Sequence, residues 1–243
     1  YIGWDAERLM DKIDEKIEEL KNKAENDLEL TVDQKEVIFN QIDKLELDFY
    51  KEGVENLKNL DKRSLNLYEQ SKKENYKRGM IIASKIYTVV MFNSGNLDET
   101  SKFITEGIEL STKEKDYKSL VSFMGNKAKI FQQSGMVEQA KKTVFEALKF
   151  ADLITNPDDR HISKAYLYVI FMTHGVQESF PKDSIFYFRE MMLKEAKLVS
   201  KKNHSRDICL AYAESTFAQE YLYGLNENHQ LAITHLKYAE ELA

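Results

Sequence analysis

Three glycines placed 40 residues apart constrain what this chain of 243 residues can fold into. Gly95, Gly135 and Gly175 each lie in a loop between two segments whose apolar residues recur at helical spacing. Glycine readily takes the left-handed conformation that closes a helix, so each glycine marks a turn between two helices. Recurrence at a fixed period of this length is typical of repeat arrays. The sequence therefore predicts an all-α fold of helix-turn-helix units with a period of about 40 residues.

The unit between Ser119 and Phe150 shows the pattern most completely. Its first helix carries an apolar stripe with steps of four, four and three residues, formed by Leu120, Met124, Ala128 and Phe131. A second row at helical spacing is entirely polar and consists of Ser122, Asn126, Lys129 and Gln133. Residues at such spacings share one face of a helix. We therefore expect the apolar stripe to be buried and the polar row to face water or a ligand.

The second helix of this unit has its own apolar face. That face is made of Val137, Ala140, Val144, Ala147 and Leu148. Its small alanines allow two helices to approach closely. Two helices alone cannot bury both apolar faces, so the unit must stack on similar neighbours.

These spacings support a resemblance to a known family. Ala128, Phe131, Gly135, Ala140 and Ala147 stand at the mutual spacings of a tetratricopeptide repeat (TPR), and the unit resembles that family. The resemblance implies a right-handed α-solenoid of TPR-like helix-turn-helix repeats. The aromatic residue of the family's first helix and its closing proline are both missing, and the period overlaps that of HEAT-type repeats. Another helical solenoid therefore remains the alternative.

Helical periodicity predicts the other elements along the chain. Residues 1–60 are expected to form acidic N-terminal helices that cap the array, with Gly53 as the hypothetical turn of a degenerate first repeat. Residues 61–243 are expected to form the TPR-like repeats. The predicted helices from Leu57 onward are 57–73, 76–93, 97–113, 118–133, 137–154, 158–173, 206–223 and 229–243, with a further helix that begins at Pro181 after an insertion. Asp61–Ser64 is the one stretch where the first of these helices could be interrupted.

The charge balance argues against nucleic-acid binding by this span. The net charge is -6, and no basic stripe is evident. Residues 1–60 hold 17 acidic and 9 basic side chains, which allows two interpretations, a solvated acidic face or an acidic docking surface. No apolar run reaches the length of about 18 residues that a membrane helix needs, so we expect no membrane insertion by this span.

The sequence contains no constellation that indicates an enzyme. It has no glycine-rich phosphate loop, no His-Glu-x-x-His and no nucleophile elbow, and we predict no cofactor and no metal site. His229 and His235 are six residues apart, which is unsuited to shared chelation, and solvation at the surface is the preferred interpretation for both. His161 lies at a predicted helix end, where a histidine commonly meets a carbonyl or water. The single cysteine, Cys209, is interpreted as a small core residue.

The resemblance implies a ligand site on the concave surface formed by the first helices of the repeats. Mapping by the turn glycines places these groove candidates there: Lys85, Ile86, Val89, Phe92, Asn93, Ser122, Asn126, Lys129, Gln133, Tyr166, Val169 and Met172. The family's clamp for C-terminal carboxylates is not matched, because Val89, Ile162 and Tyr166 stand where an asparagine and two basic residues are required. Apolar walls beside a hydrogen-bonding floor suit an extended peptide or an amphipathic helix, so a protein or peptide ligand is predicted.

A wider resemblance concerns bacterial transcription regulators in which an array of TPR-like units senses a signal for a helix-turn-helix domain on the same chain. It implies that this span is the sensory or interaction domain, with an effector outside it, and it favours a cytoplasmic location. The location would be periplasmic if a signal peptide and a membrane span lay outside the given residues. A free-standing scaffold that assembles protein partners is the alternative. The chain begins at Tyr1 and its last predicted helix has no closing signal, so we expect a fragment truncated at the C-terminus. The oligomeric state stays open.

Overall fold

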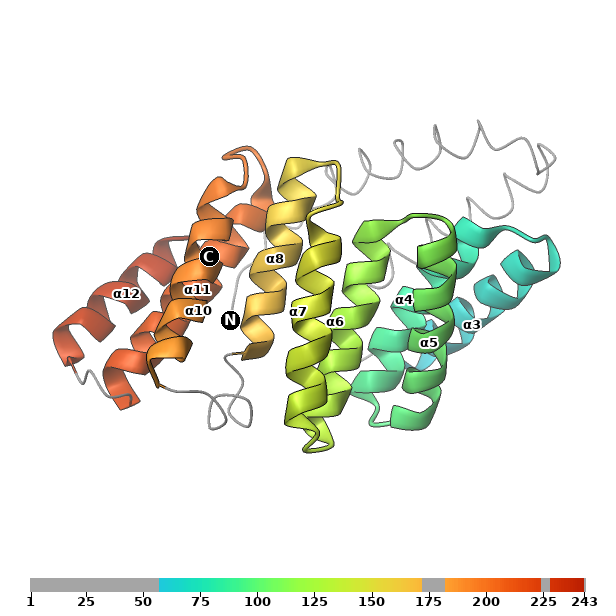
Figure 1. The fold of residues 1–243 in the computed structure, drawn as a ribbon, viewed down its shortest axis with the longest axis horizontal. Helices are drawn as coiled ribbons and strands as arrows, with labels where there is room; N and C mark the ends of the chain where they lie inside the picture. Colours follow the sequence, from blue (N-terminus) through green and yellow to red (C-terminus); the bar gives the residue numbers. More distant parts are fainter. Residues whose placement is uncertain (1–56, 172–181, 224–227, 243) are drawn as a thin grey trace. The chain divides into compact units, whose positions relative to one another are not determined.

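The computed structural model describes residues 57–171, 182–223 and 228–242. All regular secondary structure in these ranges is α-helical, which confirms the all-α prediction for this part of the chain (Figure 1). The chain divides into two compact units, Tyr1–Lys115 and Asp116–Ala243. The predicted helices before residue 57, the proposed turn at Gly53, Gly175 and the predicted start at Pro181 lie outside the described residues.

The first unit contains three described helices, α3 (Leu57–Lys73), α4 (Lys77–Asn93) and α5 (Leu97–Lys113). α3 runs without interruption through Asp61–Ser64. α4 packs against both α3 and α5. Three rings hold this core together, because Tyr68 of α3 and Tyr87 of α4 both contact Phe103 of α5, with centroids 5.0 and 4.4 Å away.

The second unit contains six described helices. They are α6 (Tyr117–Gln133), α7 (Val137–Ala151), α8 (Pro157–Phe171), α10 (Lys182–Leu198), α11 (His204–Tyr223) and α12 (His229–Leu242). α6, α8 and α11 form one row, since α8 packs against both α6 and α11. α7, α10 and α12 form a second row: α7 contacts α6 and α8, α10 contacts α8 and α11, and α12 contacts α11. This alternation gives the unit two layers of helices (Figure 1).

Four left-handed residues end successive helices at intervals of 20 residues. Asn75 and Lys115 have φ 55°, Gly95 has 77° and Gly135 has 72°. After three of these helices the second residue beyond the cap donates back to the third helical carbonyl from the end: Tyr76 to Ser71 (2.7 Å), Asn96 to Met91 (3.0 Å) and Met136 to Phe131 (2.8 Å). This pattern is a Schellman motif, which satisfies carbonyls that the helix itself leaves unpaired. The predicted turns at Gly95 and Gly135 are confirmed.

Short polar side chains fix where the next helices begin. Asn96, Asp116, Asn156 and Asn228 each accept from the amide three residues ahead, at 3.0 to 3.3 Å. Such N-caps satisfy one of the free amides of the first turn. α4, α6 and α8 consequently begin at 77, 117 and 157, at intervals of 40 residues. The predicted helix ends differ from the observed ones by up to three residues, the largest difference being at α7, which ends at Ala151 instead of 154.

The two helical layers approach closely where side chains are small. Ala128 of α6 and Ala140, Val144 and Ala147 of α7 are at most 1% exposed. The predicted apolar stripes of this hairpin are therefore confirmed as its core, with Phe131 half-buried at the edge. Larger rings fill the wider gap further along, where Phe171 of α8 stacks on Phe188 of α10 at 4.3 Å.

We expect Gly79→Ala to destabilise the protein by about 1–3 kcal/mol, the usual range for overpacking. A methyl group at Gly79 would lie 2.3 Å from Ser71 Oγ and 2.6 Å from the buried ring of Tyr76, so α3 and α4 would have to separate. Gly125→Ala is the matched control, because its methyl group would meet its nearest atom, on Tyr166, only at 3.3 Å. Urea unfolding measures both, and equal stability losses for the two variants would contradict the close approach at Gly79.

Candidate functional site

The polar row predicted on α6 lies on the side of the helix opposite to its buried stripe. Ser122, Asn126 and Lys129 are half-buried and Gln133 is exposed, whereas Leu120, Met124 and Ala128 are buried. The helix is oriented at its start by Asp116, whose carboxylate accepts from the Ser119 amide at 3.0 Å. The row therefore presents a hydroxyl, two amides and an ammonium group along about three turns of one helix.

A glycine brings α8 close beside this row. A Cβ at Gly125 would lie 3.3 Å from the Tyr166 ring and 3.5 Å from Leu167 Cδ2, so the two helices are nearly in contact at this point. Tyr166 is 37% exposed, and Ile162 and Val169 on the same helix are half-buried. Partly exposed apolar side chains of α8 therefore border the polar row of α6.

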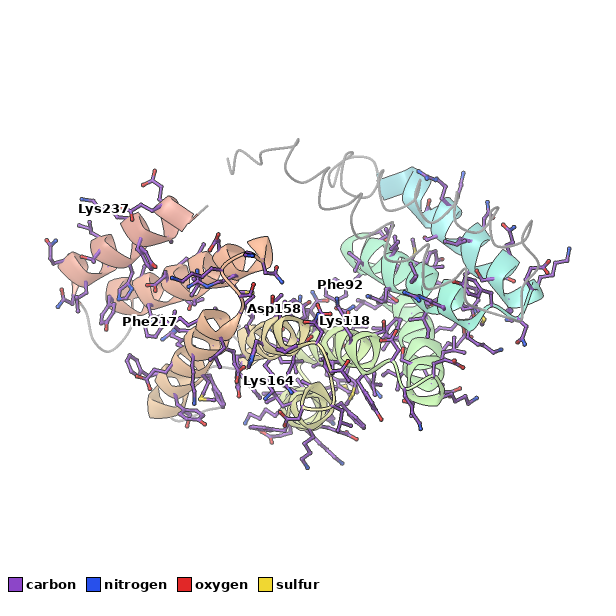
Figure 2. The ribbon with its side chains drawn as sticks, turned by 90° about the horizontal axis from the view of Figure 1, so that it is seen from above. Phe92, Lys118, Asp158, Lys164, Phe217 and Lys237 are labelled. Carbon is purple, nitrogen blue, oxygen red and sulfur yellow. The ribbon has the colours of Figure 1, made fainter. Side chains whose placement is uncertain are left out.

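Two polar contacts join α6 and α8 across this surface. Lys129 Nζ donates to Tyr166 Oη at 2.5 Å and lies 4.6 Å from the centre of the same ring, a geometry that combines a hydrogen bond with a cation–π interaction. Near the other end of the helices, Lys118 Nζ pairs with Asp159 at 2.7 Å. Figure 2 shows Lys118 close to the start of α8, where Asp158 is labelled. The open face is thus bounded by two lysines already held by α8.

The remaining groove candidates divide between the two compact units. Lys85, Ile86, Val89 and Phe92 lie on α4 and are half-buried, and Ile86 packs against the core of the first unit. The side chain of Asn93 and the whole of Met172 lie outside the described residues. The six candidates on α6 and α8, Ser122, Asn126, Lys129, Gln133, Tyr166 and Val169, are the ones that the structure brings to one surface. Their role as ligand contacts stays a prediction.

Two histidines have carboxylate partners that the sequence did not reveal. His161 Nδ1 of α8 lies 2.6 Å from Glu195 of α10, and His235 Nδ1 of α12 lies 2.5 Å from Glu214 of α11. Both carboxylates are at least nine-tenths buried. The expected surface solvation of His235 and the expected carbonyl or water partner of His161 are therefore wrong. His229, by contrast, is exposed as predicted.

The His235 pair is further enclosed by aromatic rings. Phe217 and Tyr221, both on α11, stack on the imidazole with centroids 5.5 and 5.4 Å away. A histidine held between rings and a buried carboxylate joins α11 to α12 and has little room for a substrate. This arrangement indicates a role in stability.

Asp158 forms a similar brace between α8 and the segment before α11. Its carboxylate accepts from the Ser200 amide at 2.8 Å and from Asn203 Nδ2 at 3.2 Å. These bonds, chiefly the one from the Ser200 amide, hold the pKa of Asp158 below its usual value. The carboxylate is therefore a structural acceptor here.

The described residues offer little for covalent or metal chemistry. Cys209 is half-buried, and burial raises its pKa to about 11, which keeps the thiol protonated and poorly nucleophilic near neutral pH. No cluster of three His, Cys, Asp or Glu side chains suited to a metal ion occurs in the described ranges. Within those ranges, too, every helix is too short or too polar to cross a bilayer.

Comparisons with known proteins bear on the fold. No family model matches the sequence, and no curated protein matches it either. Among solved structures, the crystal structure of BtubC (BKLC) from P. vanneervenii is similar, with a TM-score of 0.63 and 14% sequence identity over 98% of this chain and 91% of that chain. At this identity the similarity concerns the helical fold alone.

Replacing His235 with alanine should lower the free energy of unfolding by about 1–3 kcal/mol, because the buried carboxylate of Glu214 would lose its partner. His229→Ala, at an exposed position on the same helix, is the control and should change stability by less than about 0.5 kcal/mol. A double-mutant cycle with Glu214→Ala measures the coupling between the two side chains. Additive effects of the two substitutions would show that the contact contributes nothing.

Proposed function

We propose that this chain is a peptide-binding module built from TPR-like helical hairpins that stack as a right-handed solenoid. The 20-residue recurrence of left-handed turns and the small buried residues of α6 and α7 support the repeat assignment. A helical hairpin of this kind exposes one face of its first helix. In the second unit that face belongs to α6 and α8.

The observation that carries the proposal is the composition of the open face on α6 and α8. Asn126 and Ser122 are half-exposed and can offer both donors and acceptors to a peptide backbone. Tyr166, Ile162 and Val169 of the neighbouring helix offer apolar surface beside them. A hydrogen-bonding floor with an apolar border suits an extended peptide, whose backbone needs polar partners and whose side chains need apolar ones.

Lys129 has a specific part in this proposal. Its ammonium group is already satisfied by the hydroxyl and ring of Tyr166, so the pair forms a preorganised edge of the site. A ligand carboxylate that reaches this edge would meet a positive charge whose position is fixed. Preorganisation of this kind lowers the entropic cost of binding.

The wider resemblance leads us to propose that the ligand is a signal and that the module is the sensory domain of a bacterial transcription regulator located in the cytoplasm. Its effector would lie outside residues 1–243. The encoded sequence beyond Ala243 tests this directly. A helix-turn-helix domain there supports the regulator, and a continuous helical array without one supports the free-standing scaffold.

For the site itself, we expect Asn126→Ala to leave the melting temperature nearly unchanged and to weaken peptide binding by about 1–3 kcal/mol, the penalty for an unpaired polar partner. The probe is the tightest-binding peptide selected from a random 12-residue display library with the wild-type chain, and its affinity is measured by fluorescence anisotropy. Gln139→Ala removes an exposed amide from α7 and is the matched control.

Three outcomes decide the matter. Weaker binding by Asn126→Ala but not by Gln139→Ala places the peptide on the α6–α8 face. Equal binding by all three folded proteins removes Asn126 from the site. A loss of several degrees in melting temperature would instead give Asn126 a structural role.

A further inference from the structure

The outward face of α7 carries a second surface, distinct from the α6–α8 face. Six side chains line a hollow of about 650 Å³ there: Lys142, Phe145, Glu146, Lys149, Phe150 and Leu153. Phe145 is 46% exposed and Leu153 is 50% exposed. In Figure 2 this helix is seen nearly end-on, and its side chains fan outward from α6 and α8. Both apolar and charged groups are therefore available to a partner.

The charges in this stripe lack partners within the described part of the chain. The ion pairs recorded for α7 and its C-cap join Lys141 to Glu138 and Asp152 to Lys164, both beside the stripe. Lys142, Glu146 and Lys149 take part in no described ion pair and are exposed. Their order along the helix, positive, negative, positive, constrains which partner would fit.

The spacing of the stripe matches that of paired helices. Lys142, Glu146, Lys149 and Leu153 follow one another at steps of four, three and four residues, the interval of a seam between two packed helices. Phe145 and Phe150 lie on opposite flanks of that seam and reach neighbouring helices, since Phe145 contacts Phe171 and Phe150 stacks on Tyr117.

This seam is complementary to itself in the antiparallel direction. When two copies of α7 are related by a twofold axis midway between residues 147 and 148, Lys149 faces Glu146 of the other copy, and this pairing occurs twice. Lys142 faces Leu153 of the other copy, where its aliphatic stem covers the leucine and its ammonium group reaches water. The axis also brings each flanking phenylalanine toward its own equivalent.

We propose that this stripe is an interface between two copies of the chain, whose α7 helices pack antiparallel. An acidic helix from another protein would match the two lysines but would repel Glu146. A basic helix would match Glu146 alone. The second copy satisfies the alternation of charge and the apolar positions together, as an isologous interface requires. Because the patch spans a single helix of 15 residues, the association is weak and visible only at high protein concentration.

Sedimentation equilibrium of the full chain tests the proposal at concentrations from about 10 μM to about 1 mM, which covers the range expected for a small interface. The wild-type mass should rise with concentration from 28.4 kDa toward twice that value. Glu146→Lys places lysines opposite each other and Lys149→Glu places glutamates opposite each other, so each variant should associate at least about tenfold more weakly.

The double variant Glu146→Lys/Lys149→Glu is the decisive arm, because it restores opposite charges in both pairs only in the antiparallel arrangement. Its association should return to within about threefold of wild type, as expected for directly coupled sites. Lys197→Glu, at an exposed position on α10, is the control for a change of net charge and should behave as wild type. Circular dichroism verifies that every variant is folded.

A wild-type chain that stays monomeric at the highest concentration overturns the proposal. Single variants that associate as strongly as wild type also overturn it, because the interface would then lie elsewhere. The same holds for a double variant that is folded and remains as weak as the single ones.

Discussion

The left-handed residue at each helix end is the constraint on which the described fold depends. A helix of 17 residues followed by a three-residue turn reverses the chain, and the amide of the residue after the left-handed one closes on the preceding helix. Because the turns recur after equal lengths, consecutive helices present corresponding faces to each other. Small side chains at those faces then let the helices approach, as at Ala140 and Ala147, which are at most 1% exposed.

Half of these turns could be predicted from the sequence. Gly95 and Gly135 announce a left-handed conformation because glycine adopts it without strain. Asn75 and Lys115 adopt the same conformation, yet neither residue type identifies it in isolation, although asparagine tolerates it better than most. Their position midway between successive glycines was the signal that could have revealed them. The helix periodicity gave the correct elements on both sides, so the fold was predicted better than the chemistry of its turns.

The candidate site was predictable only where a single helix defines it. The polar row of α6 follows from helical spacing, and the structure places it opposite the buried stripe as expected. The contact of Lys129 with Tyr166 could not be foreseen, because it depends on how closely α8 approaches at Gly125. The His235–Glu214 pair was missed for the same reason. Its members lie 21 residues apart and meet only through the packing of α11 on α12.

The balance of energies on the outer face of α7 explains why its charges matter more than its apolar area. Covering the remaining exposed halves of Phe145 and Leu153 in two copies removes at most about 350 Å² of apolar surface, which is worth about 9 kcal/mol. Bringing two chains together costs about 4–15 kcal/mol before any side chain is ordered. The apolar contribution therefore roughly cancels the cost of association, and it does so equally for parallel and antiparallel helices. The alternation of Lys142, Glu146 and Lys149 distinguishes the two orientations, because equivalent residues face each other in a parallel pair and place like charges opposite, whereas the antiparallel pair sets lysine against glutamate.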